Sequence, residues 1–226
     1  MAYAIQMTGY GPPEVLQWQK IPEPEPQAGE ALVEVVATGV NRADLEIRSG
    51  HWPVAGDPFP YVLGLEACGV VRAVGPEVNL PIGTPVITMM QKMSGLHGLR
   101  PGGYQTHLVC PADVLATLDP KTPLQEFAAV GLVGVTAYHG LQRLQLKPKE
   151  RLAIMGAAGG VGQMAVAIAK SVGCHVIGVT HKKSQLGVLE ELGVDEIWDT
   201  SERALKDHNP IDACLEMVGG ATFGHC

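Results

Sequence analysis

Short hydrophobic runs, separated by prolines and glycines, fill the first 120 residues of the chain. Runs of this length between turn-forming residues are typical of the strands of a sandwich or barrel. The predicted strands are residues 3–7, 16–20, 31–37, 67–74, 85–89 and 104–109. This part of the chain is therefore predicted to be an all-β domain.

The pattern changes at residues 120–123. Thr122, Pro123 and Gln125 combine a helix N-cap, a proline at the first helical position and a capping-box glutamine, which predicts a helix to about residue 144. Predicted strands 152–155, 175–179, 196–198 and 211–217 then alternate with helices 161–172 and 183–192 and a short helix after Ser201. Such alternation predicts a parallel sheet with helices on its faces. The expected domains are residues 1–122 and 123–226.

Composition excludes several classes of partner and site. The net charge is −7, and the chain has no cluster of Lys and Arg beyond Lys182-Lys183, so no nucleic-acid partner is expected. The five cysteines are scattered without a Cys-x-x-Cys pair, which fits a reducing compartment. The start of the chain lacks a signal-peptide layout, and glycines interrupt the uncharged stretch 152–169, so we predict a cytoplasmic protein that does not enter a membrane.

A glycine-rich turn carries the strongest chemical signal. The segment MGAAGGVGQMAVAIAKSVG, residues 155–173, places a predicted strand, a turn and an amphipathic helix in succession. Ala157, Gly159 and Gly162 match the dinucleotide fingerprint, with alanine in place of the first glycine. Such a turn lets backbone N–H groups approach a pyrophosphate at a helix N-terminus. The alternative is a tight turn that holds no ligand.

The end of the next strand decides between NADPH and NADH. An acidic residue there would bind the ribose hydroxyls of NADH. The chain reads GVTHKK over residues 178–183, with no acid and two lysines, which favours the 2′-phosphate of NADPH. The alternative is a solvated, lysine-rich start of a helix. Asp199, after the third strand, weakens the case for NADPH, so NADH stays the alternative cofactor.

Several motifs together resemble the medium-chain dehydrogenase/reductase superfamily, in its zinc-free quinone oxidoreductase branch. They are MTGYGPPEVL, GVNRADLEIRSGHWP, GLEACGVVRAVG, GGYQTHLVCPA, GLVGVTAYHGL and MGAAGGVG. The resemblance implies a GroES-like β-domain, then a Rossmann domain with a doubly wound parallel sheet, and a cofactor between them. Family members continue well beyond residue 226, so the Rossmann domain is expected to be incomplete and the chain shortened at its C-terminus.

The resemblance also implies that no metal is bound. Zinc-dependent relatives carry a histidine ligand at the position of Leu65 and a cysteine ligand at the position of Asn41, and this chain lacks their four-cysteine lobe. His51, His97 and His107 are interpreted as surface or packing residues. Glu66 resembles a carboxylate that zinc relatives keep beside the metal, and here its expected partner is a cation or a backbone group.

The same resemblance implies a set of site residues. Asn41 and Thr136 are expected near the nicotinamide and its ribose, or else as a turn residue and as a helix hydroxyl bonded to its own backbone. Trp52 stands where many relatives have a cleft tyrosine and is expected in the substrate pocket. Residues expected to bind the cofactor are Ala157, Gly159, Gly160, Val161, Gly162, Thr180, His181 and Lys182. NADPH-using relatives commonly have lysine where Gln185 aligns.

Without a metal to polarise the substrate, the electron acceptor itself must delocalise the incoming charge. The predicted function is hydride transfer from NADPH to a quinone or an α,β-unsaturated carbonyl, a small-molecule acceptor. One alternative is a non-catalytic fragment that binds nucleotide or acts through subunit contacts. Another is a zinc-dependent alcohol dehydrogenase. The family forms homodimers, an assembly that a shortened chain puts in doubt.

Overall fold

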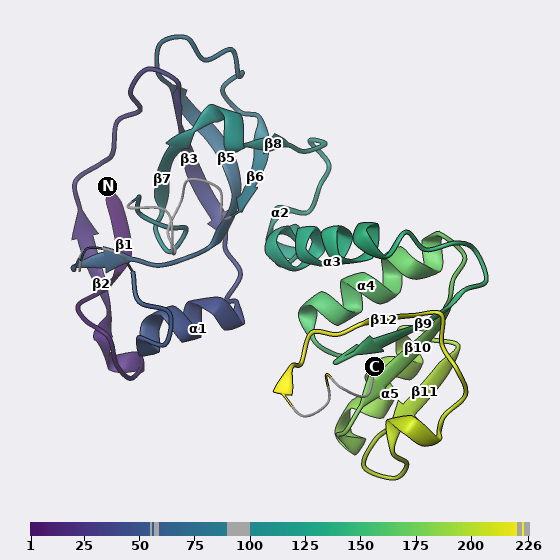
Figure 1. Cartoon of the computed structure of the whole chain (residues 1–226). Helices are drawn as coiled ribbons and strands as arrows, with labels where there is room; N and C mark the ends of the chain where they lie inside the picture. Colours follow the sequence, from purple (N-terminus) through teal and green to yellow (C-terminus); the bar gives the residue numbers. More distant parts are fainter. Residues whose placement is uncertain (55, 57–58, 90–99, 221–222, 224–226) are drawn as a thin grey trace. The chain divides into compact units, whose positions relative to one another are not determined.

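The computed structural model describes residues 1–54, 56, 59–89, 100–220 and 223. The chain divides into two compact units, Met1–Leu132 and Val133–Cys226, coloured from purple to teal and from green to yellow in Figure 1. Each unit is described by itself. The domain boundary at 122/123 stays a prediction.

The first unit is built from two antiparallel sheets. The smaller sheet has the order β2-β1-β4, and the larger has the order β7-β3-β5-β6-β8. The bounds are β1 Ala2–Met7, β2 Leu16–Ile21, β3 Glu30–Ala37, β4 Tyr61–Val62, β5 Glu66–Val74, β6 Pro85–Met89, β7 His107–Pro111 and β8 Ala116–Thr117, with 3-10 turns at Pro13–Val15 and Ala112–Val114. The all-β prediction for this part of the chain is confirmed.

Strand β7 begins later than predicted, at His107 in place of residue 104. Residues 104–106 precede β7 and form a tight connection in which Gln105 donates from its backbone N–H to the carbonyl of Gly103 at 2.8 Å. A Cβ on Gly103 would lie 2.1 Å from the carbonyl oxygen of Glu66. This close approach of two backbone segments lies directly before residues 104–106, which the hydrophobic pattern had assigned to a strand.

One helix of the first unit was absent from the periodicity-based prediction. α1 (Arg42–Ser49) begins after Asn41, whose backbone N–H donates to Asp44 Oδ2 at 2.9 Å, and it ends at Gly50, where φ is +84°. A carboxylate that binds the backbone at the first turn and a left-handed glycine at the end are ordinary helix signals. Its buried residues are Asp44 and Ile47 only, so its hydrophobic stripe is too narrow to be read as a helix from periodicity.

Strand β5 is the centre of the first unit. It runs between β3 and β6, and its buried residues include Ala67, Cys68 and Val71. Burial raises the pKa of the Cys68 thiol to about 11, which keeps it protonated. A Cβ on Gly69 would lie 2.1 Å from the carbonyl oxygen of Glu34, so only glycine allows β3 and β5 to approach here.

The prediction of a single helix from residue 122 to 144 is wrong. The structure has two helices, α2 (Leu124–Phe127) and α3 (Gly131–Leu144), with a turn between them. The expected capping box is also wrong, because the N-cap of α2 is Pro123 and no side chain caps it. The break has a tertiary cause: Glu66 accepts the backbone N–H of Leu132 at 2.7 Å, so a new helix N-terminus forms there.

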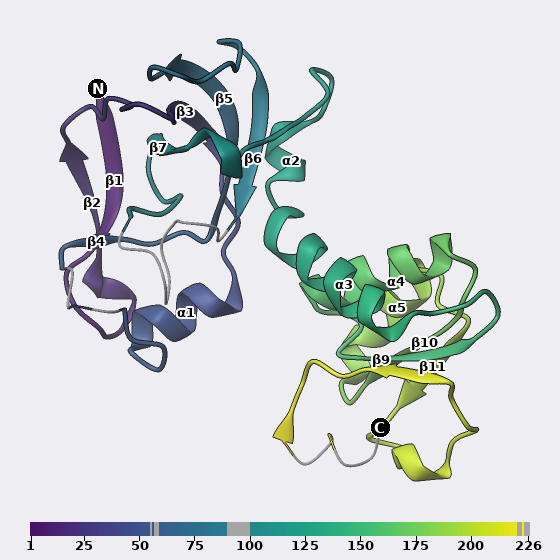
Figure 2. The same cartoon turned by 45° about the horizontal axis from the view of Figure 1, so that its top comes forward.

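The second unit is a parallel sheet with the strand order β11-β10-β9-β12. Its elements are β9 Arg151–Met155, α4 Gly160–Ser171, β10 His175–Thr180, α5 Leu186–Glu191, β11 Glu196–Asp199 and β12 Ala213–Leu215, with 3-10 turns at Lys183–Gln185 and Leu205–Asp207. Figure 2 shows α3 and α4 on one side of this sheet. The expected Rossmann-type order is confirmed, whereas the helix after Ser201 is only a 3-10 turn and the last strand is shorter than predicted.

Successive residues of a strand point to opposite faces of the sheet, and both faces of this parallel sheet are buried. Leu152 and Ile154 of β9 pack against α4, in a cluster that includes Ala165 and Ala169. Ala153 and Met155 face the other side, in a cluster that includes Trp198. Burial of both faces explains why these strands read as nearly continuous hydrophobic runs in the sequence.

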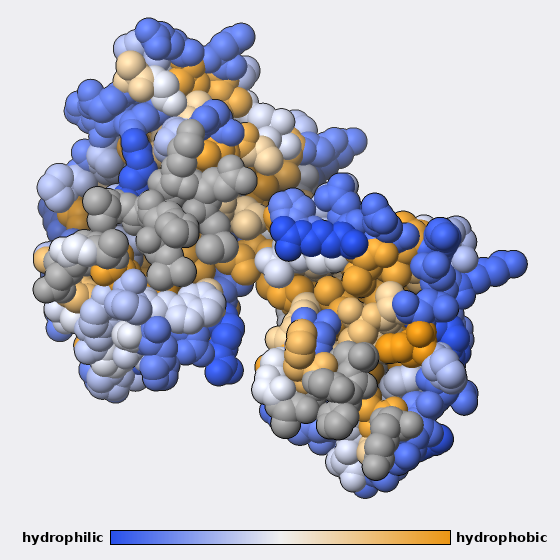
Figure 3. All heavy atoms as spheres, viewed as in Figure 1, coloured by the Kyte–Doolittle hydropathy of each residue, from blue (hydrophilic) through white to orange (hydrophobic). Residues whose placement is uncertain are grey.

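The surface of the second unit includes an apolar groove between α3 and α4, lined among others by Tyr138, Leu141, Ile168 and Val172. Figure 3 shows apolar side chains exposed around these helices. Among the residues that the structure describes, no helix has the length and hydropathy needed to cross a membrane.

Candidate functional site

The turn between β9 and α4 is shaped by two glycines with different roles. Gly156 has φ of +67°, a left-handed conformation, and its N–H donates to the carbonyl of Val179 in β10 at 3.2 Å. A Cβ on Gly162 would lie 2.4 Å from the carbonyl oxygen of Gly156 and 2.6 Å from Cα of Ala157. The turn therefore needs glycine at 156 for its conformation and at 162 for the close approach of helix and turn. Gly156 was not among the predicted residues, although it begins the glycine-rich run.

The N-terminus of α4 provides donors for an anion. Gly159 is the N-cap, and the N–H of Gln163 makes the first bond back to it, at 2.8 Å. The N–H groups of Gly160, Val161 and Gly162 precede that bond, so they lack intrahelical acceptors and lie at the positive end of the helix dipole. No acidic residue occurs in this first turn. The Val161 side chain packs in the core, so its contribution to a ligand is its backbone.

A hollow of about 240 Å³ adjoins the turn at the carboxyl ends of β9 and β10. Its lining includes Gly156, Gly159, Thr180, His181 and Lys182. Ligands of open parallel sheets bind at this edge, outside the carboxyl ends of the strands. Four of the eight predicted cofactor residues, Gly159, Thr180, His181 and Lys182, thus line one hollow. Ala157 is buried in the adjoining turn.

The loop after β10 is held by its own hydrogen bonds. The Thr180 hydroxyl donates to Gln185 Oε1 at 2.6 Å and accepts the backbone N–H of Lys182 at 3.1 Å. These bonds fix the backbone of the loop while the Lys182 side chain stays exposed. Thr180 therefore shapes the rim of the hollow, and its hydroxyl already has partners inside the loop.

The charges around the hollow are not equivalent. The ammonium of Lys183 pairs with Glu202 at 2.7 Å, whereas Lys182 has no ion-pair partner in the part of the chain that the structure describes. Asp199 Oδ1 accepts from the backbone N–H and the hydroxyl of Ser201, at 2.9 and 2.7 Å, and these bonds lower the pKa of Asp199. The acid is ionised beside the loop, and Lys182 is the lysine left to meet a bound anion.

In the first unit, Asn41 and Glu66 form a buried polar pair. Asn41 is 7% exposed and Glu66 is 2% exposed. Asn41 Nδ2 donates to Glu66 Oε1 at 2.7 Å, and the backbone N–H of Leu132 donates to Glu66 Oε2 at 2.7 Å. The open question about Glu66 is answered for the described residues: its partners are an amide and a backbone group. Asn41 is also the N-cap of α1.

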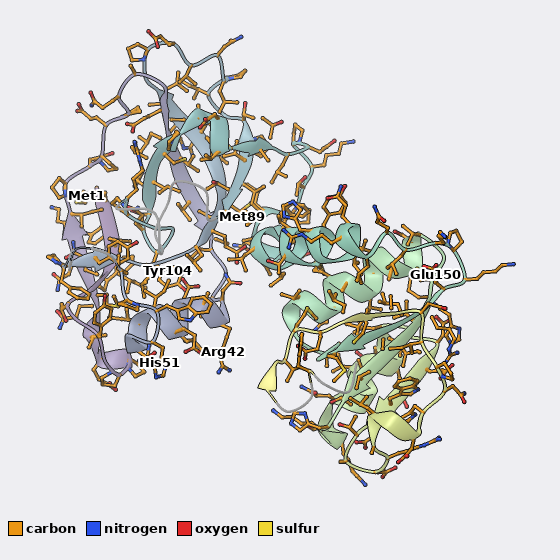
Figure 4. The ribbon with its side chains drawn as sticks, viewed as in Figure 1. Met1, Arg42, His51, Met89, Tyr104 and Glu150 are labelled. Carbon is orange, nitrogen blue, oxygen red and sulfur yellow. The ribbon has the colours of Figure 1, made fainter. Side chains whose placement is uncertain are left out.

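Asp44 and Tyr104 complete this buried region, and sequence reasoning missed both. Burial raises the pKa of Asp44, and its Oδ1 is buried without a hydrogen-bond partner among the described residues. The Tyr104 hydroxyl lies near this carboxylate and also lacks a partner of regular geometry. Figure 4 shows Tyr104 over α1, the helix whose first turn contains Asp44. The Asn41-x-x-Asp44 spacing could have identified Asp44, but no local signal marks Tyr104.

The remaining predicted residues lie at exposed positions of separate units. Trp52 follows α1 in the first unit and is 44% exposed. Thr136 lies in α3 within the second unit and is exposed. Their placement near a nicotinamide or a substrate stays a prediction.

Two of the three histidines that were interpreted as surface or packing residues lie in the described part of the structure. His51 is exposed and pairs with Glu46 at 3.0 Å, and His107 contacts the Thr106 hydroxyl at 3.0 Å. His97 lies outside the described residues. Within the described residues no group of three or more His, Cys, Asp and Glu side chains could hold a metal ion. Leu65 is 0% exposed in the core of the first unit.

Two family models match the chain. Residues 27–120 match the alcohol dehydrogenase GroES-like domain, and residues 160–226 match the zinc-binding dehydrogenase domain. Both matches agree with the observed order along the chain, in which a unit of antiparallel sheets precedes a unit with a parallel sheet.

Solved structures and curated relatives extend the comparison. The chain is 30% identical to a quinone oxidoreductase from Pseudomonas syringae, with a TM-score of 0.86, covering 100% of this chain and 69% of that one. It is 28% identical to mycobacterial Rv1454c, solved in complex with NADPH, with a TM-score of 0.83 and coverages of 99% and 69%. Prostaglandin reductase-3 of Mus musculus is 30% identical over 89% of this chain and 52% of that protein. Across eight curated relatives the chain spans 9–61% of the length of each.

Proposed function

This chain belongs to the medium-chain dehydrogenase/reductase superfamily, and from that membership we propose that it is an NADPH-dependent reductase of quinones or α,β-unsaturated carbonyls that works without zinc. The observation that carries the proposal is the hollow at the β9–α4 turn, with donors at a helix N-terminus and Lys182 on its rim. A dinucleotide phosphate is the ligand whose charges match these groups.

The residues of the turn fit such a cofactor. The absence of a side chain at Gly159 and Gly160 leaves the helix N-terminus accessible to a pyrophosphate, and no acid in the first turn opposes its charge. When bound, the dihydronicotinamide supplies the hydride. The protein's part is to hold the cofactor and the acceptor in the reacting orientation and to keep water out.

Lys182 supports the choice of NADPH over NADH. Its ammonium is exposed and, among the described residues, has no ion-pair partner, while its backbone is fixed by Thr180. A 2′-phosphate at the rim would gain a charge-assisted contact there. Asp199 opposes an anion, but its carboxylate is already bonded to Ser201.

In the proposed reaction Asn41 and Thr136 contact the nicotinamide side of the cofactor, and Trp52 offers a flat apolar face to the acceptor. Quinones and enones suit a site without a Lewis acid because they delocalise the incoming charge. Two of the similar solved structures are quinone oxidoreductases, which supports the acceptor class.

Two residues support a zinc-free site. Leu65 is an apolar core residue where zinc-dependent relatives have a histidine ligand, and the Asn41 amide is bonded to Glu66. Neither side chain provides the thiolate or imidazole that catalytic zinc requires. Stoichiometric zinc in elemental analysis of the purified protein would contradict this part of the proposal.

Nucleotide binding is tested by titrating NADPH and NADH against tryptophan fluorescence. Lys182→Ala should weaken NADPH binding about 10-fold, the loss of one charged contact of about 1.4 kcal/mol, and leave NADH unchanged. Lys183→Ala is the matched control, because that lysine pairs with Glu202, and it should leave NADPH affinity within about 2-fold.

Turnover is tested by following NADPH oxidation with a panel of ortho-quinones and enones. Acceleration by at least one acceptor supports the reductase. Saturable NADPH binding without turnover on any acceptor would favour the alternative of a non-catalytic nucleotide-binding chain.

A further inference from the structure

The carboxylate of Glu66 lies in an enclosure made for it. A Cβ on Gly39 would lie 2.1 Å from Oε1, and a Cβ on Gly131 would lie 2.7 Å from Oε2. The Thr38 hydroxyl donates to the carbonyl of Glu66 at 2.6 Å, which fixes its backbone. Two missing side chains and a backbone anchor leave the carboxylate little freedom to move.

Each carboxylate oxygen of Glu66 has a donor from a different element. Oε1 binds the side-chain amide of Asn41, the N-cap of α1, and Oε2 binds the backbone N–H of Leu132 in the first turn of α3. Arg42, labelled in Figure 4, marks the start of α1 directly after Asn41. One buried carboxyl group therefore joins the starts of two helices.

The chemistry of the pair assigns the orientation of the Asn41 amide. Asn41 Nδ2 donates to Glu66 Oε1, so the NH₂ group of Asn41 faces Glu66 and its carbonyl oxygen points away. The backbone N–H of Asn41 is held by Asp44 as well. The Asn41 side chain also takes part in the capping box of α1 with Asp44, so the amide is held from both sides.

We propose that Glu66 is a positioning residue for hydride transfer, which sets the orientation of the Asn41 amide and the start of α3, the helix that contains Thr136. The inference rests on the proposed function, because it takes Asn41 and Thr136 to contact the cofactor. Glu66 itself touches neither cofactor nor acceptor. Its effect passes through the two groups that it binds.

Glu66→Gln is the informative variant because it keeps the shape and removes one acceptor. The amide that this substitution introduces would place an NH₂ group against either the Asn41 amide or the Leu132 N–H, so one of the two bonds is lost or Asn41 turns over. We expect kcat/KM to fall about 100-fold, the usual effect of a misplaced reacting group. Glu34→Gln is the matched control, since Glu34 forms an exposed pair with Arg72, and it should leave kcat/KM within about 2-fold.

A double-mutant cycle separates positioning from a structural role. If Glu66 acts through Asn41, the double variant Glu66→Gln/Asn41→Ala should be no slower than the slower single variant. A merely structural role gives losses in kcat/KM that multiply, and that outcome would overturn the inference. If Glu66→Gln does not fold, Glu66→Asp replaces it in the same cycle, because it keeps the charge and shortens the reach by one methylene.

A second readout does not depend on turnover. The Asn41 side-chain amide should give a hydrogen-exchange-protected pair in ¹⁵N NMR spectra, assigned by its loss in Asn41→Ala, and Glu66→Gln should abolish that protection. Exchange at the unprotected rate in the parent protein would overturn the inference. If no acceptor is reduced, the proposed reductase fails, and this spectrum alone then decides whether Glu66 fixes Asn41.

Discussion

Replacing Gly162 by alanine should destabilise the second unit, although alanine favours helices. Gly162 lies in the first turn of α4, where a Cβ would meet the carbonyl oxygen of Gly156 at 2.4 Å and Cα of Ala157 at 2.6 Å. Both are backbone atoms of the turn, so no side chain can rotate away from the added methyl group. The helix and the turn must separate instead.

The magnitude follows from two opposing terms. Overpacking costs about 1–3 kcal/mol, and a contact with backbone on two residues falls at the upper end. Alanine in place of glycine stabilises a helix interior by about 1 kcal/mol. The expected net loss in the free energy of unfolding is therefore about 2 kcal/mol.

Urea unfolding measures this loss. Trp198 reports on the second unit in a background with Trp18→Phe and Trp52→Phe. Gly187→Ala is the matched control: Gly187 is exposed in α5, nothing lies within 4 Å of its Cβ, and alanine should stabilise the unit by up to about 1 kcal/mol. A Gly162→Ala midpoint at or above that of the parent would refute the close approach of α4 to the turn.

Three further predictions concern stability and reactivity. Hydrogen bonds from Arg151 hold the pKa of Glu196 at about 2, below its usual 4.5, so the stabilisation is complete above pH 4.5 and is lost as pH falls toward 2. Because the pair is partly exposed, we expect the free energy of unfolding to fall by about 1 kcal/mol over this pH range. Glu196→Gln should abolish this pH dependence, which is measured by unfolding the protein at a series of acid pH values. Cys68, buried with its pKa raised to about 11, should react with a thiol reagent only after unfolding, and rapid labelling of native protein would contradict its burial. Leu152→Ala should cost about 2–5 kcal/mol in urea unfolding, and a loss below about 1 kcal/mol would show that the core collapses around the cavity.

Strand and helix assignments succeeded where a local pattern carried the information. In the second unit, the strands of the parallel sheet were predicted within a few residues because both of their faces are buried and they read as hydrophobic runs. The break between α2 and α3 was missed because its cause, the contact of Glu66 with Leu132, joins residues 66 positions apart. No window of sequence contains both partners.

The candidate site divides in the same way. The glycine turn was recognisable because backbone approach to an anion demands glycine at fixed spacing, and the structure places Gly159 of this turn at the edge of a hollow. The pairing of Lys183 with Glu202, which leaves Lys182 as the lysine of the rim, depends on how the loop folds against β11 and its following turn. Two adjacent lysines look equivalent in sequence and are not equivalent in space.

The sequence by itself determined the class of each unit and the position of the dinucleotide turn, because these depend on local periodicity and on the backbone freedom of glycine. Only the tertiary structure decided the partners of Glu66, whose two carboxylate oxygens accept from Asn41 and from the start of α3. The sequence motif placed this carboxylate beside a metal ligand that is here leucine, and left its partner open. Folding packs Gly39 and Gly131 around it and brings the two donors to it, because a buried polar group is stable only where it is hydrogen-bonded.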